Sequence, residues 1–132
     1  MVRGRCLCGL VRYRAAPPLY AATFCHCESC RRAVGSHIVG WFTVRLESLV
    51  FDAGRPAEFP SSPGVRRGHC TRCGTTLTYY SEERPTEIDL TIASLDDPGS
   101  ISVADHIWME DALAWDSPAD DRPQFPGTRP LP

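Results

Sequence analysis

Cys70-Thr71-Arg72-Cys73-Gly74 places two cysteines on either side of two residues and follows them directly with glycine. Two intervening residues allow a tight turn to direct both thiolates at one metal ion, and the glycine permits a positive φ after the turn. A Cys-x-x-Cys pair can also be a redox motif, but such motifs accompany a βαβ pattern, which this sequence lacks. We therefore interpret the stretch as one half of a zinc site.

Two further clusters supply the other cysteines: Cys6-Leu7-Cys8-Gly9 and Cys25-His26-Cys27-Glu28-Ser29-Cys30. The chain has seven cysteines, so they cannot all pair in disulfides, and their close spacing suits ligands of one ion. Four thiolates close a tetrahedral structural site, and three remain. A site with three protein ligands keeps one position for water or substrate, as catalytic zinc does. The sequence thus predicts two zinc ions per chain.

Spacing alone leaves open which four cysteines belong together. One possible set combines the second and third clusters as a zinc ribbon: Cys27, Cys30, Cys70 and Cys73. The second site would then be formed by Cys6, Cys8 and Cys25.

Short runs with strand patterns are separated by turn-forming residues, since the chain has 12 prolines and 10 glycines. Apolar or alternating patterns predict strands at 10–14, 38–44, 77–80 and 88–92. A short helix is predicted at 28–34, and a second turn or two within 105–115. We expect one all-β, mainly antiparallel domain over residues 1–132, in which 116–132 is an irregular tail rich in Pro and Asp.

The order of the clusters and their flanking residues resembles the glutathione-dependent formaldehyde-activating enzyme family, also called the centromere-protein-V/formaldehyde-activating type. The resemblance covers about residues 3–126 and rests on these motifs: GRCLCGLVRY (4–13), CHCESCRR (25–32), CTRCGT (70–75), SLDDP (94–98), HIW (106–108) and Trp115. Similarity to this family implies an all-β, zinc-stapled fold of the β-tent kind.

The resemblance also implies how the cysteines are divided. The structural zinc would be held by Cys6, Cys8, Cys70 and Cys73, and the open, catalytic zinc by Cys25, Cys27 and Cys30. The implied activity is that of a carbon–sulfur lyase acting on thiol/aldehyde adducts. The family's substrates are glutathione and formaldehyde, which together form S-hydroxymethylglutathione.

Two other functions are compatible with the same cysteines. The first is a non-enzymatic zinc module that binds a partner, as some centromere-protein-V-like relatives suggest. A long basic tail would favour this function, and this chain lacks one. The other is a thiol-based metal or redox sensor, because an open site with three thiolates is accessible to oxidants.

Several charged or imidazole side chains lie close to the cysteines in sequence. Arg31 and Arg32 either offset the negative charge of three thiolates on zinc or decorate the surface. We expect the Arg66-Arg67 pair to be solvated. The histidines are expected to be packed or solvated rather than to bind metal: His26, His37, His69 and His106.

Composition excludes some classes of function. All 14 basic residues are arginine, which removes lysine-based Schiff-base chemistry. The net charge of −2 does not favour nucleic-acid binding, and the sequence has no apolar run of the roughly 20 residues needed to span a bilayer. The first residues do not resemble a signal peptide, so a cytoplasmic protein with reduced thiols is expected.

Overall fold

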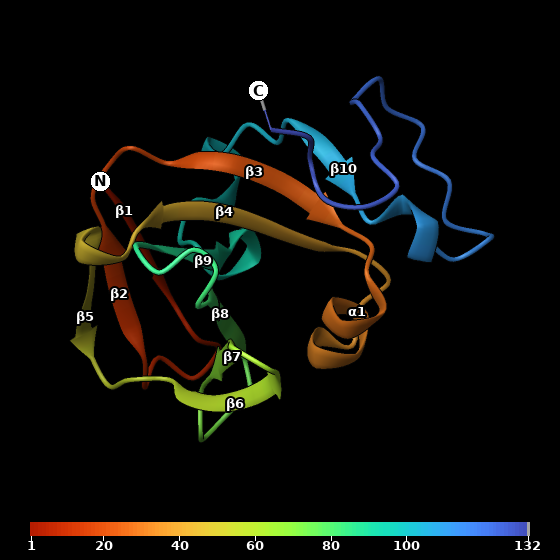
Figure 1. Cartoon of the computed structure of the whole chain (residues 1–132). Helices are drawn as coiled ribbons and strands as arrows, with labels where there is room; N and C mark the ends of the chain where they lie inside the picture. The colour runs from red at the N-terminus through yellow and green to blue at the C-terminus, as the bar shows by residue number, and fades with distance from the viewer. Residues whose placement is uncertain (132) are drawn as a thin grey trace.

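The computed structural model describes residues 1–131, so Pro132 at the end of the predicted tail lies outside the described part. Its strands form two sheets (Figure 1). The smaller sheet has the order β1-β2-β5: Val2–Arg5, Arg12–Ala15 and Leu49–Ala53. The larger has the order β10-β3-β4-β9-β8-β7-β6: Asp105–Ile107, Tyr20–Cys25, Val39–Arg45, Glu87–Thr91, Thr76–Ser81, Val65–His69 and Ala57–Ser62.

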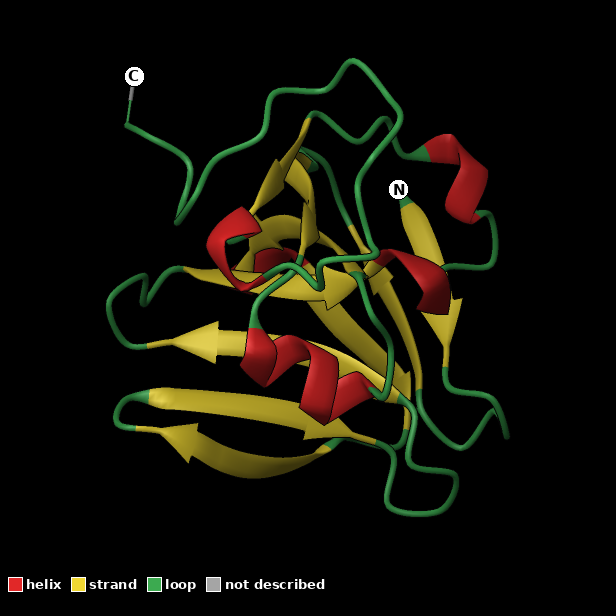
Figure 2. Ribbon diagram, turned by 90° about the vertical axis from the view of Figure 1, so that its right-hand side faces the viewer, coloured by secondary structure: helices red, strands yellow, loops and turns green. Residues whose placement is uncertain are grey.

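All strand pairs are antiparallel except that of β10 with β3, so the predicted all-β class is confirmed. The predicted helix at 28–34 is also confirmed as α1 (Glu28–Val34), which begins after its N-cap Cys27 and ends at Gly35 with φ 74°. Short 3₁₀ turns occupy Leu46–Ser48, Ile92–Ser94, Pro98–Ser100 and Met109–Asp111. Figure 2 shows these helical segments outside the sheets. Within residues 1–131 no helix is long and apolar enough to cross a membrane.

The helical turn predicted within 105–115 is only partly correct. Asp105–Ile107 is strand β10, and the helical part is confined to the 3₁₀ turn Met109–Asp111. The strand forms because β10 pairs with the free edge of β3 on one side and with the tail on the other, where His106 N donates to Pro123 O at 2.9 Å. These partners are distant in sequence and override the local pattern.

Strand β4 has apolar side chains on both faces, because successive residues of a strand point to opposite sides. Phe42 is fully buried in the main core, together with Tyr13 and Leu90. Its neighbour Trp41 faces the other way, into a second cluster that contains Cys25 and Cys30. One strand thus supports both the main core and the packing around a cysteine cluster.

The small sheet is joined to the large one where β1 meets the turn after β9. The Tyr13 hydroxyl hydrogen-bonds Ser94 Oγ at 2.7 Å, and Ser94 Oγ donates to Thr91 O at 2.9 Å. Gly4 pairs with Leu95, and a Cβ at Gly4 would collide with the Tyr13 hydroxyl. This close approach packs β1 against the 3₁₀ turn Ile92–Ser94.

We predict that Ser94→Ala destabilises the protein more than Tyr13→Phe does. The alanine variant leaves the buried Tyr13 hydroxyl without its partner, at a cost of about 1–3 kcal/mol. The phenylalanine variant removes one hydroxyl while Ser94 keeps Thr91 O, at a cost of about 0.5–1.5 kcal/mol. Denaturant unfolding of both variants at equal zinc concentration measures the difference. A Ser94→Ala protein as stable as wild type would contradict this account of the junction.

Candidate metal centres

Four cysteines meet between two turns. Cys6 and Cys8 lie in the turn after β1, and Cys70 and Cys73 in the turn after β7. Their four sulfurs all lie within 4.8 Å of one another, with Cys6 Sγ to Cys8 Sγ at 3.7 Å and Cys8 Sγ to Cys70 Sγ at 3.8 Å. A tetrahedral zinc site with Zn–S bonds of about 2.3 Å has sulfur–sulfur edges of about 3.8 Å. The cluster therefore has the dimensions of a four-thiolate metal site.

The two turns have the same backbone pattern. Gly9 N donates to Cys6 O at 3.1 Å, and Gly74 N donates to Cys70 O at 2.9 Å. Both glycines have positive φ, 80° and 79°, which a residue with a side chain rarely adopts. The role expected of Gly74 is confirmed, and Gly9 has the same role.

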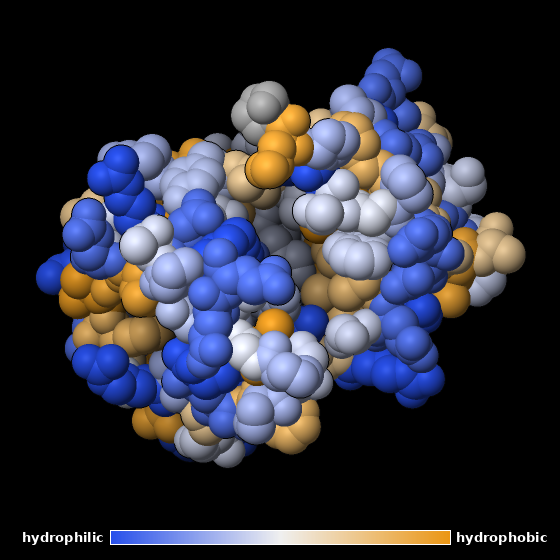
Figure 3. Space-filling view, viewed as in Figure 1, coloured by the Kyte–Doolittle hydropathy of each residue, from blue (hydrophilic) through white to orange (hydrophobic). Residues whose placement is uncertain are grey.

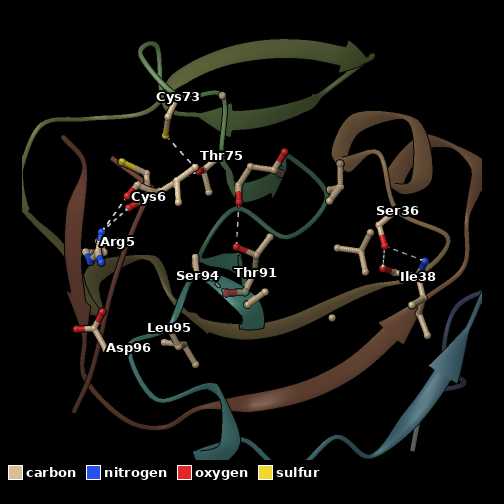
Figure 4. Close-up of a pocket in the computed structure, with 17 residues that line it drawn as sticks. Arg5, Cys6, Ser36, Ile38, Cys73, Thr75, Thr91, Ser94, Leu95 and Asp96 are labelled. Atoms are coloured by element: carbon tan, nitrogen blue, oxygen red, sulfur yellow. Dashed lines mark hydrogen bonds between the residues drawn. The ribbon is translucent and has the colours of Figure 1, made fainter. Parts of the chain in front are cut away.

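Donors from the chain surround the sulfurs of this cluster. Val11 N donates to Cys6 Sγ at 3.3 Å. Thr75 Oγ1 accepts from Leu7 N at 3.0 Å, which leaves its hydroxyl proton to donate to Cys73 Sγ at 3.2 Å (Figure 4). The hydrogen bond from Thr75 lowers the pKa of Cys73 to about 5. The contact with Thr75 thus favours the thiolate of Cys73, the form that binds metal.

The other three cysteines form a second cluster beside α1. Cys25 ends β3, Cys27 is the N-cap of α1, and Cys30 lies in the first helical turn. Their sulfurs also lie within 4.8 Å of one another, and Cys30 N donates to Cys27 Sγ at 3.3 Å. Cys25 and Cys30 are buried and Cys27 is partly exposed, so the cluster is accessible only beside Cys27.

The structure groups the thiols four and three, as the family resemblance implies. The zinc-ribbon set, which would draw on both clusters, does not form a single group within residues 1–131. The three-cysteine cluster packs against Val39 and Trp41 of β4 and against Tyr79, Ile107 and Trp108. This apolar surrounding limits water on the side facing the sheet.

A buried arginine contacts the three-cysteine cluster. Arg67 is 8% exposed, and its Nη1 donates to Cys30 Sγ at 3.4 Å. Hydrogen bonds with Cys25 and Cys27, together with Arg67, hold the pKa of Cys30 well below its usual range although burial opposes this. The expectation that Arg66-Arg67 is a solvated pair is therefore wrong for Arg67. Alternation along β7 turns Arg67 inward while Arg66 pairs with Glu58 outside.

Arg31 and Arg32 do not offset charge at the cluster through a contact with sulfur. Arg32 is exposed and pairs with Glu28, four residues earlier on α1. Arg31 Nη2 donates to Asp111 O at 3.4 Å. Asp111 also accepts from Glu28 N at 3.2 Å, so it holds the start of the helix. A role for Arg31 and Arg32 at the cluster was inferred only from their position next to Cys30 in sequence. The geometry of α1 directs their side chains to Asp111 and Glu28 instead.

His26 lies between two cysteines but turns into the protein. It is fully buried, and its Nε2 hydrogen-bonds His106 Nδ1 at 2.9 Å. His106 Nε2 in turn bonds Asp120 Oδ2 at 2.9 Å, and His26 Nδ1 lies 3.5 Å from Asp116 Oδ2. Burial lowers the pKa of His26, so the ring stays neutral. This chain of contacts ties the tail to the cysteine loop.

Like His26, the other three histidines are packed or partly exposed side chains. His106 is a buried structural residue, whereas His37 is about half exposed beside Trp115. His69 is partly exposed and belongs to neither cysteine cluster. Asp116 and Asp120 had no signal in the sequence beyond the acidity of the tail, because their partners are distant along the chain.

A cavity of about 680 Å³ lies beside the four-cysteine cluster, not the three-cysteine one (Figure 4). Its wall is rich in hydroxyl groups and includes Ser36, Thr75, Thr91 and Ser94. Elsewhere on the face shown in Figure 3, hydrophilic and apolar residues are interspersed. The cavity is lined by cysteines of the four-cysteine cluster and not by those of the three-cysteine cluster.

The chain is similar in sequence and in fold to known proteins. The chain is 30% identical over 76 residues to an uncharacterized lyase of Schizosaccharomyces pombe, a match covering 58% of this chain. The match covers 55% of the yeast protein, so the chain spans about half the length of this curated relative. A crystal structure of a Rhodobacter sphaeroides protein shares the fold, with a TM-score of 0.58 and 21% identity over 93% of this chain and 98% of that one.

A family model described as glutathione-dependent formaldehyde-activating enzyme matches residues 1–111, which include both cysteine clusters. The match covers most of the chain and ends just before the tail that carries Asp116 and Asp120. This chain therefore belongs to the glutathione-dependent formaldehyde-activating enzyme family.

Proposed function

We propose that the protein is a zinc-dependent carbon–sulfur lyase-type enzyme that acts on adducts of a thiol and an aldehyde. Family membership supports the reaction class, with glutathione and formaldehyde as substrates and S-hydroxymethylglutathione as their adduct. The observation that carries the proposal is the incomplete second cluster. Within the described residues it offers three sulfurs, of which only that of Cys27 belongs to a partly exposed residue.

Zinc fits both clusters, because soft thiolates at tetrahedral spacing are ligands that zinc prefers. Cys6, Cys8, Cys70 and Cys73 would hold the structural ion, and Cys25, Cys27 and Cys30 the catalytic one. Zinc bound by three cysteines supplies a Lewis acid that lowers the pKa of an incoming thiol. Two ions per chain follow from this assignment.

The side chains around the three-cysteine cluster leave it open to a thiol on one side and exclude water on the other. Trp41 and Trp108 shield the sulfurs from water on the protein side, while the partly exposed Cys27 leaves an approach from solvent. In the forward direction the thiolate sulfur bonds to the aldehyde carbon, and the carbonyl oxygen takes up a proton. The thiol and the aldehyde together account for every atom of the adduct, so no oxidant or reductant is required. The reverse reaction breaks the same bond.

The two clusters should respond differently to loss of one cysteine. Cys70→Ser should unfold or aggregate the protein, because Cys70 and Cys8 join turns that are 62 residues apart. Cys27→Ser should leave a folded protein with one zinc ion, because the cluster beside α1 lies within a short stretch of chain. Native mass spectrometry counts the ions, and circular dichroism reports folding. A folded Cys70→Ser protein and an unfolded Cys27→Ser protein would reverse the assignment.

An incoming thiol should bind the protein saturably at the second cluster. Cobalt in place of zinc reports this binding, because each added thiolate strengthens the sulfur-to-metal charge-transfer absorption. Titration with glutathione should raise the band in wild type, while Cys25→Ser, which lacks one sulfur of the cluster, gives no rise. Preference for glutathione over a simple small thiol supports the proposed substrate. Absence of a response to any thiol contradicts the enzyme and favours a binding module.

A further inference from the structure

Arg67 is a buried cation without a carboxylate partner in the described part of the chain. Its Nε donates to Ser61 Oγ at 3.1 Å, and its guanidinium carbon lies 4.9 Å from the centre of the Tyr79 ring. The ion pairs found within residues 1–131 do not include Arg67. Burial of an uncompensated cation is costly, so the arginine needs a negative group nearby.

Cys30 is the group that can provide this charge. Its sulfur lies 3.4 Å from Arg67 Nη1, whereas burial raises the pKa of Tyr79 and keeps that ring neutral. Three thiolates around a divalent ion carry a net charge of −1, and a fourth thiolate from a substrate brings it to −2. A fixed positive charge next to one sulfur stabilises both of these negatively charged assemblies, and the second more than the first.

We propose that Arg67 is a positioning residue of the three-cysteine site: its buried guanidinium contacts the Cys30 sulfur, strengthens metal binding there and favours uptake of a substrate thiolate. The first part rests on the proposed zinc ion at this cluster, and the second part also on the proposed reaction with a thiol. Arg67 belongs to β7, the strand that leads directly to Cys70, so the same strand serves both cysteine clusters. Ser61 and Tyr79 hold the guanidinium in place from the neighbouring strands β6 and β8.

The chain contains a matched control for this arginine. Arg66 is its neighbour on β7 and points to the opposite face, where its guanidinium carbon lies 4.6 Å from the centre of the Tyr80 ring. Arg66 Nε also pairs with Glu58 at 3.3 Å. Arg66→Gln and Arg67→Gln therefore remove the same charge from the same strand and from similar aromatic contacts. They differ in the partner that is lost, which is the Cys30 sulfur for the buried Arg67 and the Glu58 carboxylate for the more exposed Arg66.

The test measures the affinity of each of the two zinc ions of the full-length protein by competition with a chromogenic chelator. Arg67→Gln should weaken zinc binding at the three-cysteine site by about 10- to 100-fold, which is the usual effect of removing a partner of a metal ligand. Zinc binding at the four-cysteine site should be unchanged. Arg67→Lys should recover part of the affinity because it keeps the charge. Arg66→Gln should match wild type at both ions.

Cobalt spectra supply a readout that a purely structural role would not move. With Arg67→Gln, the sulfur-to-cobalt absorption of the weaker site should shift to longer wavelength, because sulfurs without the cation are easier to oxidise. The midpoint of the glutathione titration should rise at the same time. Ser61→Ala, which keeps the arginine but removes its anchor, should change both quantities less and in the same direction.

The outcomes separate this inference from the proposed function. Equal zinc affinities and spectra for Arg67→Gln and Arg66→Gln would overturn the role of Arg67. Loss of both ions from Arg67→Gln, with Ser61→Ala and Arg67→Lys behaving like wild type, would also overturn it, since the arginine would then only support the fold. A wild-type protein that takes up no thiol would contradict the enzyme, while a selective loss of one ion in Arg67→Gln would still support the contact with Cys30.

Discussion

Four cysteine sulfurs meet at tetrahedral spacing where the turn after β1 approaches the turn after β7. This convergence sets the relation between the two sheets, because β1 and β2 belong to the small sheet and β7 and β8 to the large one. Cys6 and Cys70 are also members of the main hydrophobic core, so core packing and sulfur geometry stabilise the same arrangement. A domain of this size has a modest core, and a metal ion at this point would add folding free energy.

The second cluster depends on the first through the large sheet. Strand β4 carries Phe42 into the main core and Trp41 against Cys25 and Cys30, so the position of the three sulfurs follows from the packing behind them. The tail adds a further tie, because His106 of β10 bonds both His26 and Asp120. The three-cysteine cluster is thus supported by β4 and by the tail, and it is accessible beside Cys27.

The negative charge of thiolates would be stabilised differently in the two clusters. The four-cysteine cluster lies partly at the surface, with Cys8 exposed, and its sulfurs receive hydrogen bonds from backbone N–H groups and from Thr75. Water can therefore solvate its charge. The three-cysteine cluster is more deeply buried, and a guanidinium lies beside it. This difference follows from desolvation, because a charge removed from water needs a fixed partner.

Local sequence by itself determined the features that depend on neighbouring residues. Cysteine spacing and the following glycine predicted the turn at Cys70–Gly74. The helix pattern predicted α1, and the strand patterns predicted β2 of the small sheet and β4, β8 and β9 of the large one to within a few residues. Tertiary structure alone decided which cysteine sulfurs lie together, why Arg67 is buried, and why Asp105–Ile107 is a strand. These outcomes require contacts between residues far apart in the chain. Short-range spacing limits the backbone of a turn or helix, but only the packed sheets bring those distant groups together.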